Sequence, residues 1–167
     1  MNKIISDYIG KELIFVKKQL LGKTYELKYE NEVLCQMKIQ NVFTKRAIVS
    51  GFLLKEDIEF YKNSFLSNET CIRNVNNELP FATYKSPILS LSGTIFLPMG
   101  EQLFVKYDLF GLNYEVRDQF NETLIKLKNN MFYPQAKIEI LKKSNLLDKH
   151  PWILALLFYV MLKRRSK

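Results

Sequence analysis

The sequence predicts a mainly β fold, an antiparallel β-barrel that encloses an apolar C-terminal α-helix. Three observations carry this prediction. Apolar and polar residues alternate with period two over much of the chain, polar turns separate the alternating runs, and one apolar run near the C-terminus departs from that period. The chain has 167 residues, of which 47% are hydrophobic, and this suffices for one substantial core. We therefore expect a single domain over residues 1–167.

The first clear hairpin is predicted between residues 24 and 40. Its first strand alternates apolar with charged residues from Thr24 to Glu30, and its second strand runs from Val33 to Gln40 with Leu34 on the outward set. The short polar connection Asn31-Glu32 favours a tight reversal between them. The side chains expected to point inward are Tyr25, Leu27, Tyr29, Val33, Cys35, Met37 and Ile39.

A second hairpin of the same design is predicted from Leu112 to Leu127. Both hairpins open with Tyr-Glu-aliphatic-basic, at Tyr25 and at Tyr114, and both continue through a polar turn into a second alternating strand. This similarity suggests two related halves. The alternative is that any two amphipathic hairpins look alike.

Further strands are predicted where β-branched and aromatic residues are dense. They cover residues 13–17, 46–53, 87–91, 94–97, 103–107 and 136–141. The polar segment 63–80 is rich in asparagine and predicts long loops around at most one strand near residues 70–74. The economical assembly of so many strands is a barrel or a sandwich.

The apolar run from Trp152 to Leu162 predicts a helix over about residues 151–162. A membrane-spanning helix needs about 20 apolar residues, whereas shorter runs are typical of buried core helices. Pro151 suits the first turn of a helix, and His150 or Asp148 could cap its free N–H groups. Because this helix is apolar on every side, we expect the strands to close around it.

The arrangement at the C-terminus resembles that of the tubby C-terminal-like superfamily. The residues that carry the resemblance are the strand AKIEIL, the apolar helix that follows it and the terminal KRRSK. Phospholipid scramblases and LURP-one-related proteins are similar. The resemblance implies a closed barrel around a hydrophobic C-terminal helix, with duplicated halves. It covers residues 103–167 best and 24–40 second, and it includes no phosphoinositide-binding motif, cysteine cluster or calcium-ligating run.

No pattern in the sequence indicates catalysis, a metal or a cofactor. The single histidine, His150, has no partner in the sequence that would position it as a base. Cys35 and Cys71 show no zinc-binding spacing, and the six glycines form no phosphate loop. We therefore expect a protein that is not an enzyme and that has no catalytic residues, metal ligands or cofactor.

The charge favours an anionic partner. The chain has a formal net charge of +8, with a cluster of cations near the C-terminus. We expect a cytoplasmic binding module, peripheral to the membrane, that binds anionic phospholipid. The candidate anion site is Lys163, Arg164 and Arg165, because Lys142 and Lys143 should lie at the opposite pole, beyond a Debye length of about 8 to 10 Å.

Two other classes of function stay open. Nucleic acid would also match the positive charge, but it needs exposed aromatic residues beside the cations or a helix that is free to enter a groove. A structural or regulatory protein with a protein partner is the third class. The sequence neither supports nor rejects it.

Overall fold

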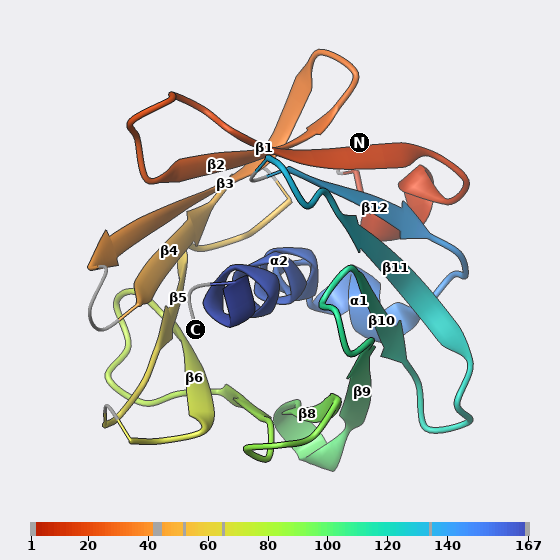
Figure 1. The fold of residues 1–167 in the computed structure, drawn as a ribbon. Helices are drawn as coiled ribbons and strands as arrows, with labels where there is room; N and C mark the ends of the chain where they lie inside the picture. Colours follow the sequence, from red (N-terminus) through yellow and green to blue (C-terminus); the bar gives the residue numbers. More distant parts are fainter. Residues whose placement is uncertain (1–2, 42–44, 52, 65, 134, 166–167) are drawn as a thin grey trace.

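The structure is a computed structural model that describes residues 3–41, 45–51, 53–64, 66–133 and 135–165. Within these ranges, twelve strands form one closed antiparallel barrel, and a helix lies inside it (Figure 1). The predicted fold class is confirmed. The strands are β1 (Glu12–Lys17), β2 (Thr24–Tyr29), β3 (Glu32–Asn41), β4 (Arg46–Ser50), β5 (Ile58–Tyr61), β6 (Glu69–Asn74), β7 (Ala82–Lys85), β8 (Ser92–Phe96), β9 (Gln102–Tyr107), β10 (Asn113–Arg117), β11 (Thr123–Asn129) and β12 (Ala136–Ile140).

Each strand pairs with its neighbours in the sequence, and β1 pairs with β12 to close the barrel. The closing register sets Leu13 opposite Ile138 and Phe15 opposite Ala136, and all four side chains are buried. Closure pairs both sides of the first and last strands, so neither is left as an unpaired edge. Both predicted hairpins are present, as β2–β3 and β10–β11. The proposed kinship of the two halves stays a prediction.

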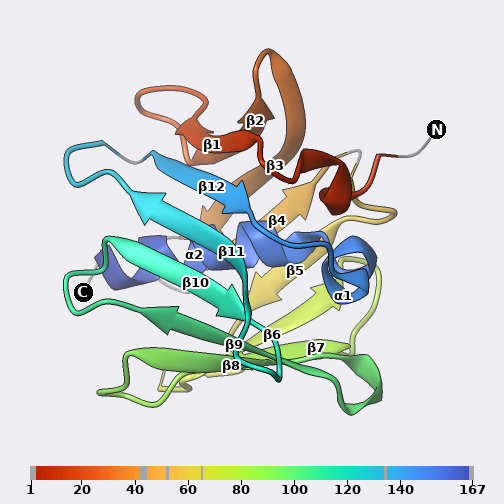
Figure 2. The same ribbon diagram turned by 90° about the vertical axis from the view of Figure 1, so that its right-hand side faces the viewer.

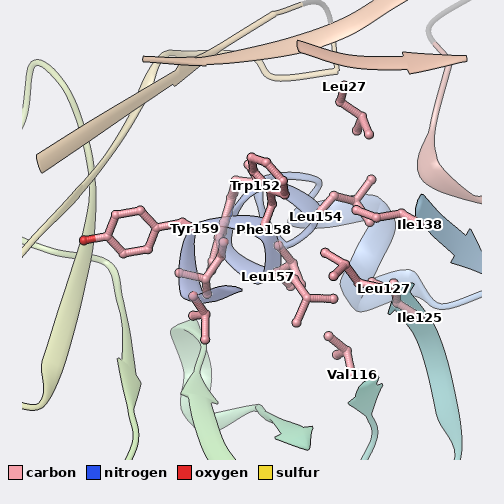
Figure 3. Packing of buried hydrophobic residues seen from close by; sticks show 14 of the residues in the cluster. Leu27, Val116, Ile125, Leu127, Ile138, Trp152, Leu154, Leu157, Phe158 and Tyr159 are labelled. Carbon is pink, nitrogen blue, oxygen red and sulfur yellow. The ribbon is translucent and has the colours of Figure 1, made fainter. Parts of the chain in front are cut away.

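The helix α2 (Trp152–Arg165) lies inside the barrel, and its residues Trp152–Met161 are all buried. Phe158 stacks on Phe15 of β1, with ring centroids 4.2 Å apart. In Figure 3, strand residues such as Leu127 and Ile138 point from the wall towards the helix. Full burial of each large apolar side chain is worth about 1.5–3 kcal/mol. The helix therefore forms the centre of the core, which is the place predicted for it.

Of the two residues predicted to cap this helix, His150 does so through its backbone and Asp148 does not. The His150 carbonyl accepts the N–H of Ile153 in the first turn of α2, and His150 is also the C-cap of the short helix α1 (Asn145–Lys149). The Asp148 carboxylate instead accepts hydrogen bonds from the backbone N–H (2.8 Å) and hydroxyl (2.7 Å) of Ser6. It thereby joins the 3-10 helix η1 (Ile5–Tyr8) to α1, a helix that the sequence did not predict.

Three strand predictions need correction. Residues 87–91 are not a strand but the β7–β8 connection, in which Ser90 N–H donates to the Pro87 carbonyl. The strand predicted over 46–53 ends at Ser50, because the backbone of Gly51, at φ 145°, lies against Cys35 and a Cβ there would come within 2.6 Å of its Cα. Leu34 is buried rather than outward, because a β-bulge opposite Leu27 and Lys28 turns it into the core.

The strands alternate in direction, so their connections divide between the two ends of the barrel. We call the end where α2 finishes the C-terminal end. It carries the β1–β2, β3–β4, β5–β6, β7–β8, β9–β10 and β11–β12 connections. The opposite end carries η1, α1, the 3-10 helix η2 (Pro98–Gly100) and the remaining connections, and Figure 2 shows the C-terminus and α1 at these two ends.

Candidate anion and lipid-binding end of the barrel

Large apolar side chains are exposed on the connections at the C-terminal end. Of its six connections, five carry at least one such residue within the part of the chain that the structure describes. We call this set the apolar rim. It consists of Leu20, Leu21, Leu66, Ile88, Leu89, Leu91, Leu109, Phe110, Met131, Phe132 and Tyr133. Exposed apolar residues that gather on one face mark a site of interaction with a partner or a membrane.

Positive charge gathers at the same end. Outside the strands, the described residues of the C-terminal end include seven cations and one carboxylate, a formal net charge of +6. The cations are Lys18, Lys23, Lys45, Lys62, Lys163, Arg164 and Arg165, and the carboxylate is Asp108. The apolar rim and these cations therefore share one end of the barrel, where Lys18 also pairs with Glu26 of β2 at 3.2 Å.

The opposite end of the barrel has a negative net charge. Its described residues outside the strands include six cations and nine carboxylates, a formal net charge of −3. The cations are Lys3, Lys11, Lys55, Lys142, Lys143 and Lys149, and the carboxylates are Asp7, Glu30, Glu56, Asp57, Glu78, Glu101, Asp118, Glu122 and Asp148. Large apolar side chains are exposed here too, on an end whose net charge is negative: Ile4, Ile9, Val75, Leu79, Met99 and Phe120. Charge is thus polarised along the barrel.

Lys142 and Lys143 lie at this acidic end, beyond β12, while α2 finishes at the other end (Figure 2). The two basic groups therefore occupy opposite poles, as expected. Lys142 pairs with Glu122 at 2.7 Å.

The three predicted anion-binding residues all reach the C-terminal end but have different surroundings. Lys163 donates to the Thr70 hydroxyl at 3.2 Å and lies over the ring of Tyr159. Arg165 is exposed and donates to three backbone carbonyls of the β11–β12 connection, those of Asn130, Met131 and Tyr133, at 2.8–3.1 Å. Arg165 thereby holds the part of the apolar rim that contains Met131 and Tyr133.

Arg164 points into a cluster of tyrosines. Its guanidinium carbon lies 3.9 Å from the ring centroid of Tyr107, close enough for a cation–π interaction. The Arg164 Nε and the hydroxyls of Tyr84 and Tyr114 are buried, and the Tyr114 hydroxyl interacts with Arg164 while the Tyr84 hydroxyl interacts with Ser86 and Tyr107. Burial raises the pKa of Tyr114, and the nearby Arg164 charge offsets part of that rise. The sequence had no signal for this cluster, because its members come from β7, β9, β10 and α2.

Two cavities flank Arg164. One, of about 360 Å³, lies under the β7–β8 connection, and the other, of about 280 Å³, lies beside the β9–β10 connection. Arg164 lines both, and Asp or Glu lines neither among the residues that the structure describes. Cavities of this kind suit an anionic group better than a cation.

Other chemistry finds less support in the geometry. Burial raises the pKa of the Cys35 thiol to about 12, which keeps it protonated and unreactive near neutral pH. Burial also lowers the pKa of His150, whose ring contacts Trp152 with centroids 5.8 Å apart. Across the described ranges, no group of three or more His, Cys, Asp or Glu residues gathers as a metal site would require.

No family model, curated protein or solved structure matches this chain. Within the described residues, no helix has the length and apolar character needed to cross a membrane.

Proposed function

We propose that this protein is a non-enzymatic binding module that docks on anionic phospholipid through the C-terminal end of its barrel. The observation that carries the proposal is the coincidence of the apolar rim with the +6 end. A membrane surface offers what both features need, since its headgroups are anionic and the layer beneath them is apolar. We also infer a tubby-like family, for which the helix inside a closed barrel is the only support.

The two contributions are of useful size. A cation near an anionic leaflet contributes about 1 kcal/mol, and full burial of a Leu or Phe side chain contributes about 1.5–3 kcal/mol. Four cations and two half-inserted apolar side chains would therefore supply roughly 5.5–7 kcal/mol, which corresponds to a dissociation constant between micromolar and millimolar. Such binding is reversible and weakens with salt.

Nucleic acid fits the rim less well. Phe110, Phe132 and Tyr133 could stack on bases, but most rim residues are aliphatic and offer no ring for stacking. An aliphatic side chain gains more from an acyl layer than from a base. Oligonucleotide binding is therefore the competing outcome of the test.

The test compares two double variants that change the net charge equally. Leu89→Asp with Phe110→Asp alters the rim, and Leu79→Asp with Met99→Asp alters exposed residues of the acidic end. Asp is tolerated at Met99, whose φ is 66°. Binding is measured by co-sedimentation with vesicles that contain phosphatidylserine, with pure phosphatidylcholine vesicles and a single-stranded oligonucleotide in parallel.

The rim variant should bind phosphatidylserine vesicles at least tenfold more weakly, and the acidic-end variant should bind like the unmodified protein. Equal losses in both variants would contradict docking through the rim. Binding to the oligonucleotide but not to vesicles would replace the lipid by nucleic acid, and binding to neither would leave a protein partner as the better explanation.

A further inference from the structure

The cavity under the β7–β8 connection has a charged inner part and an apolar outer part. Tyr84, Tyr107 and Arg164 line it on the inside, and Ile88, Leu89 and Leu109 line it near the apolar rim. Its volume of about 360 Å³ is within the usual range of small-molecule sites, roughly 300–1,000 Å³. The cavity therefore has the size and the two-part character of a site for one amphiphilic molecule.

The Arg164 guanidinium is held in place but not neutralised. It stacks on Tyr107, and the Tyr107 hydroxyl is fixed by Ser86 Oγ at 2.7 Å and the Ser90 carbonyl at 3.0 Å. None of the ion pairs or hydrogen bonds formed within the described ranges satisfies the buried Arg164 Nε. Arg164 lines the cavity, so an oxyanion bound there would be stabilised by the guanidinium charge.

Tyr84 forms part of the inner wall of the cavity. Its side chain is 96% buried, and its hydroxyl interacts with Ser86 and Tyr107. Its ring is confined by close packing on Gly93, where any side chain would collide with the phenol. Burial raises the pKa of Tyr84, which keeps the hydroxyl protonated and able to donate.

The residues that line the cavity also favour a ligand of negative charge. Lys62, Lys163 and Arg164 contribute three positive charges, and within the described part of the chain no carboxylate lines this cavity. Lys62 and Lys163 also bond to the Ser67 carbonyl (2.6 Å) and the Thr70 hydroxyl (3.2 Å).

The geometry points to a binding site for a single-chain amphiphile with an oxyanion head, a carboxylate or a phosphate monoester. The head pairs with the Arg164 guanidinium, and the chain lies along Ile88, Leu89 and Leu109 towards the rim. The planar guanidinium suits two oxygens of one head, and charge-assisted bonds of this kind are about twice as strong as neutral ones. This inference goes beyond membrane docking, because it concerns one dissolved molecule in one cavity.

Isothermal titration calorimetry with four probes separates the contributions of head and chain. Octyl phosphate and octanoate carry both parts, inorganic phosphate has only the head, and octyl glucoside has the chain with an uncharged head. All are used below their micelle concentrations. Octyl phosphate or octanoate should saturate one site at least tenfold more tightly than either control, and the tighter of the two identifies the head.

Three variants assign the site. Arg164→Gln should weaken the preferred amphiphile at least tenfold, whereas Lys143→Gln, which removes one positive charge from an exposed position at the opposite end of the barrel, should leave its affinity unchanged. Arg164→Lys, which keeps the charge but removes the planar guanidinium, should weaken binding several-fold. This conservative variant keeps the test valid if Arg164→Gln fails to fold.

Four results would overturn the inference: no saturation by octyl phosphate or octanoate, equal binding of octyl glucoside, equal binding of inorganic phosphate, or equal losses from Arg164→Gln and Lys143→Gln. Its failure and that of the proposed function are distinguishable. Vesicle binding without amphiphile binding would leave docking intact and remove the cavity site. Amphiphile binding without vesicle binding would leave the cavity site intact and remove membrane docking.

Discussion

Glu59 offers the sharpest test of the outer wall of the barrel. It lies on β5 and is only 2% exposed, with one carboxylate oxygen accepting from Arg46 Nε of β4 and the other from Arg73 Nε of β6 at 2.6 Å. Burial alone would raise its pKa, but the two arginines outweigh that effect and hold the pKa below its usual value of 4.5. A single carboxylate therefore ties three neighbouring strands together.

The change Glu59→Gln keeps the shape and removes the charge. Breaking a fully buried ion pair costs about 3–5 kcal/mol, and losing one charged hydrogen bond costs about 1.5–3 kcal/mol. The Arg46 side chain is 44% exposed and can return to water, so the lower range applies. We expect the free energy of unfolding to fall by about 2 kcal/mol at neutral pH, which lowers the melting temperature by roughly 4–8 °C.

The lowered pKa of Glu59 also predicts how the loss of stability in Glu59→Gln changes with pH. A carboxylate whose folded pKa is lowered contributes stability that is complete above its unfolded pKa, near 4.5, and that is lost as the pH falls through the folded value. The difference between the unmodified protein and Glu59→Gln should therefore be largest at neutral pH and shrink in acid. Urea unfolding followed by circular dichroism measures it.

A matched control lies on the neighbouring strand. Glu69 of β6 pairs with Lys85 at 2.9 Å on a more exposed part of the wall, so Glu69→Gln should cost less than about 1 kcal/mol. Equal losses for the two variants, or a Glu59→Gln difference that does not change with pH, would refute the reasoning.

Two further predictions concern the enclosed helix and its end. Phe158→Ala should lower the free energy of unfolding, measured by urea titration, by about 3–5 kcal/mol, because it leaves a cavity where the Phe158 ring stacks on Phe15. A loss below about 1 kcal/mol would contradict an enclosed helix. Arg165→Gln should speed proteolysis of the β11–β12 connection, because three carbonyls lose their donor. Cleavage there at the unmodified rate would show that Arg165 does not hold the connection.

Period-two alternation predicted the β2–β3 and β10–β11 hairpins, since their charged and apolar residues alternate cleanly. It missed β5 and β7, which have four residues each and offer too few positions to establish a period. The strand predicted over residues 87–91 was wrong because their aliphatic side chains suggested a strand, whereas in the fold these side chains line a cavity and belong to the apolar rim. The burial of Leu34 could not be predicted, because it depends on the β-bulge between β2 and β3, and a bulge depends on strand pairing rather than on the local sequence pattern.

The candidate site could be predicted only in part. The terminal cations were visible as a run, and the apolar helix before them indicated that they would emerge at one pole. The apolar rim was not visible, because its members are dispersed between Leu20 and Tyr133 and gather only when strands of alternating direction sort the connections between two ends. The polarity of charge along the barrel depends on the same sorting.

Membrane docking through the C-terminal end can be tested most directly by measuring depth at two matched positions. Leu89 on the rim and Met99 at the acidic end are 101% and 99% exposed. Single Leu89→Cys and Met99→Cys variants, labelled with an environment-sensitive fluorophore, leave the buried Cys35 and Cys71 unlabelled. With phosphatidylserine vesicles at low salt, the label at position 89 should shift to the blue and be quenched by a nitroxide lipid, while the label at position 99 should stay unchanged. An equal response at both positions, or a response at position 99 alone, would contradict docking through this end.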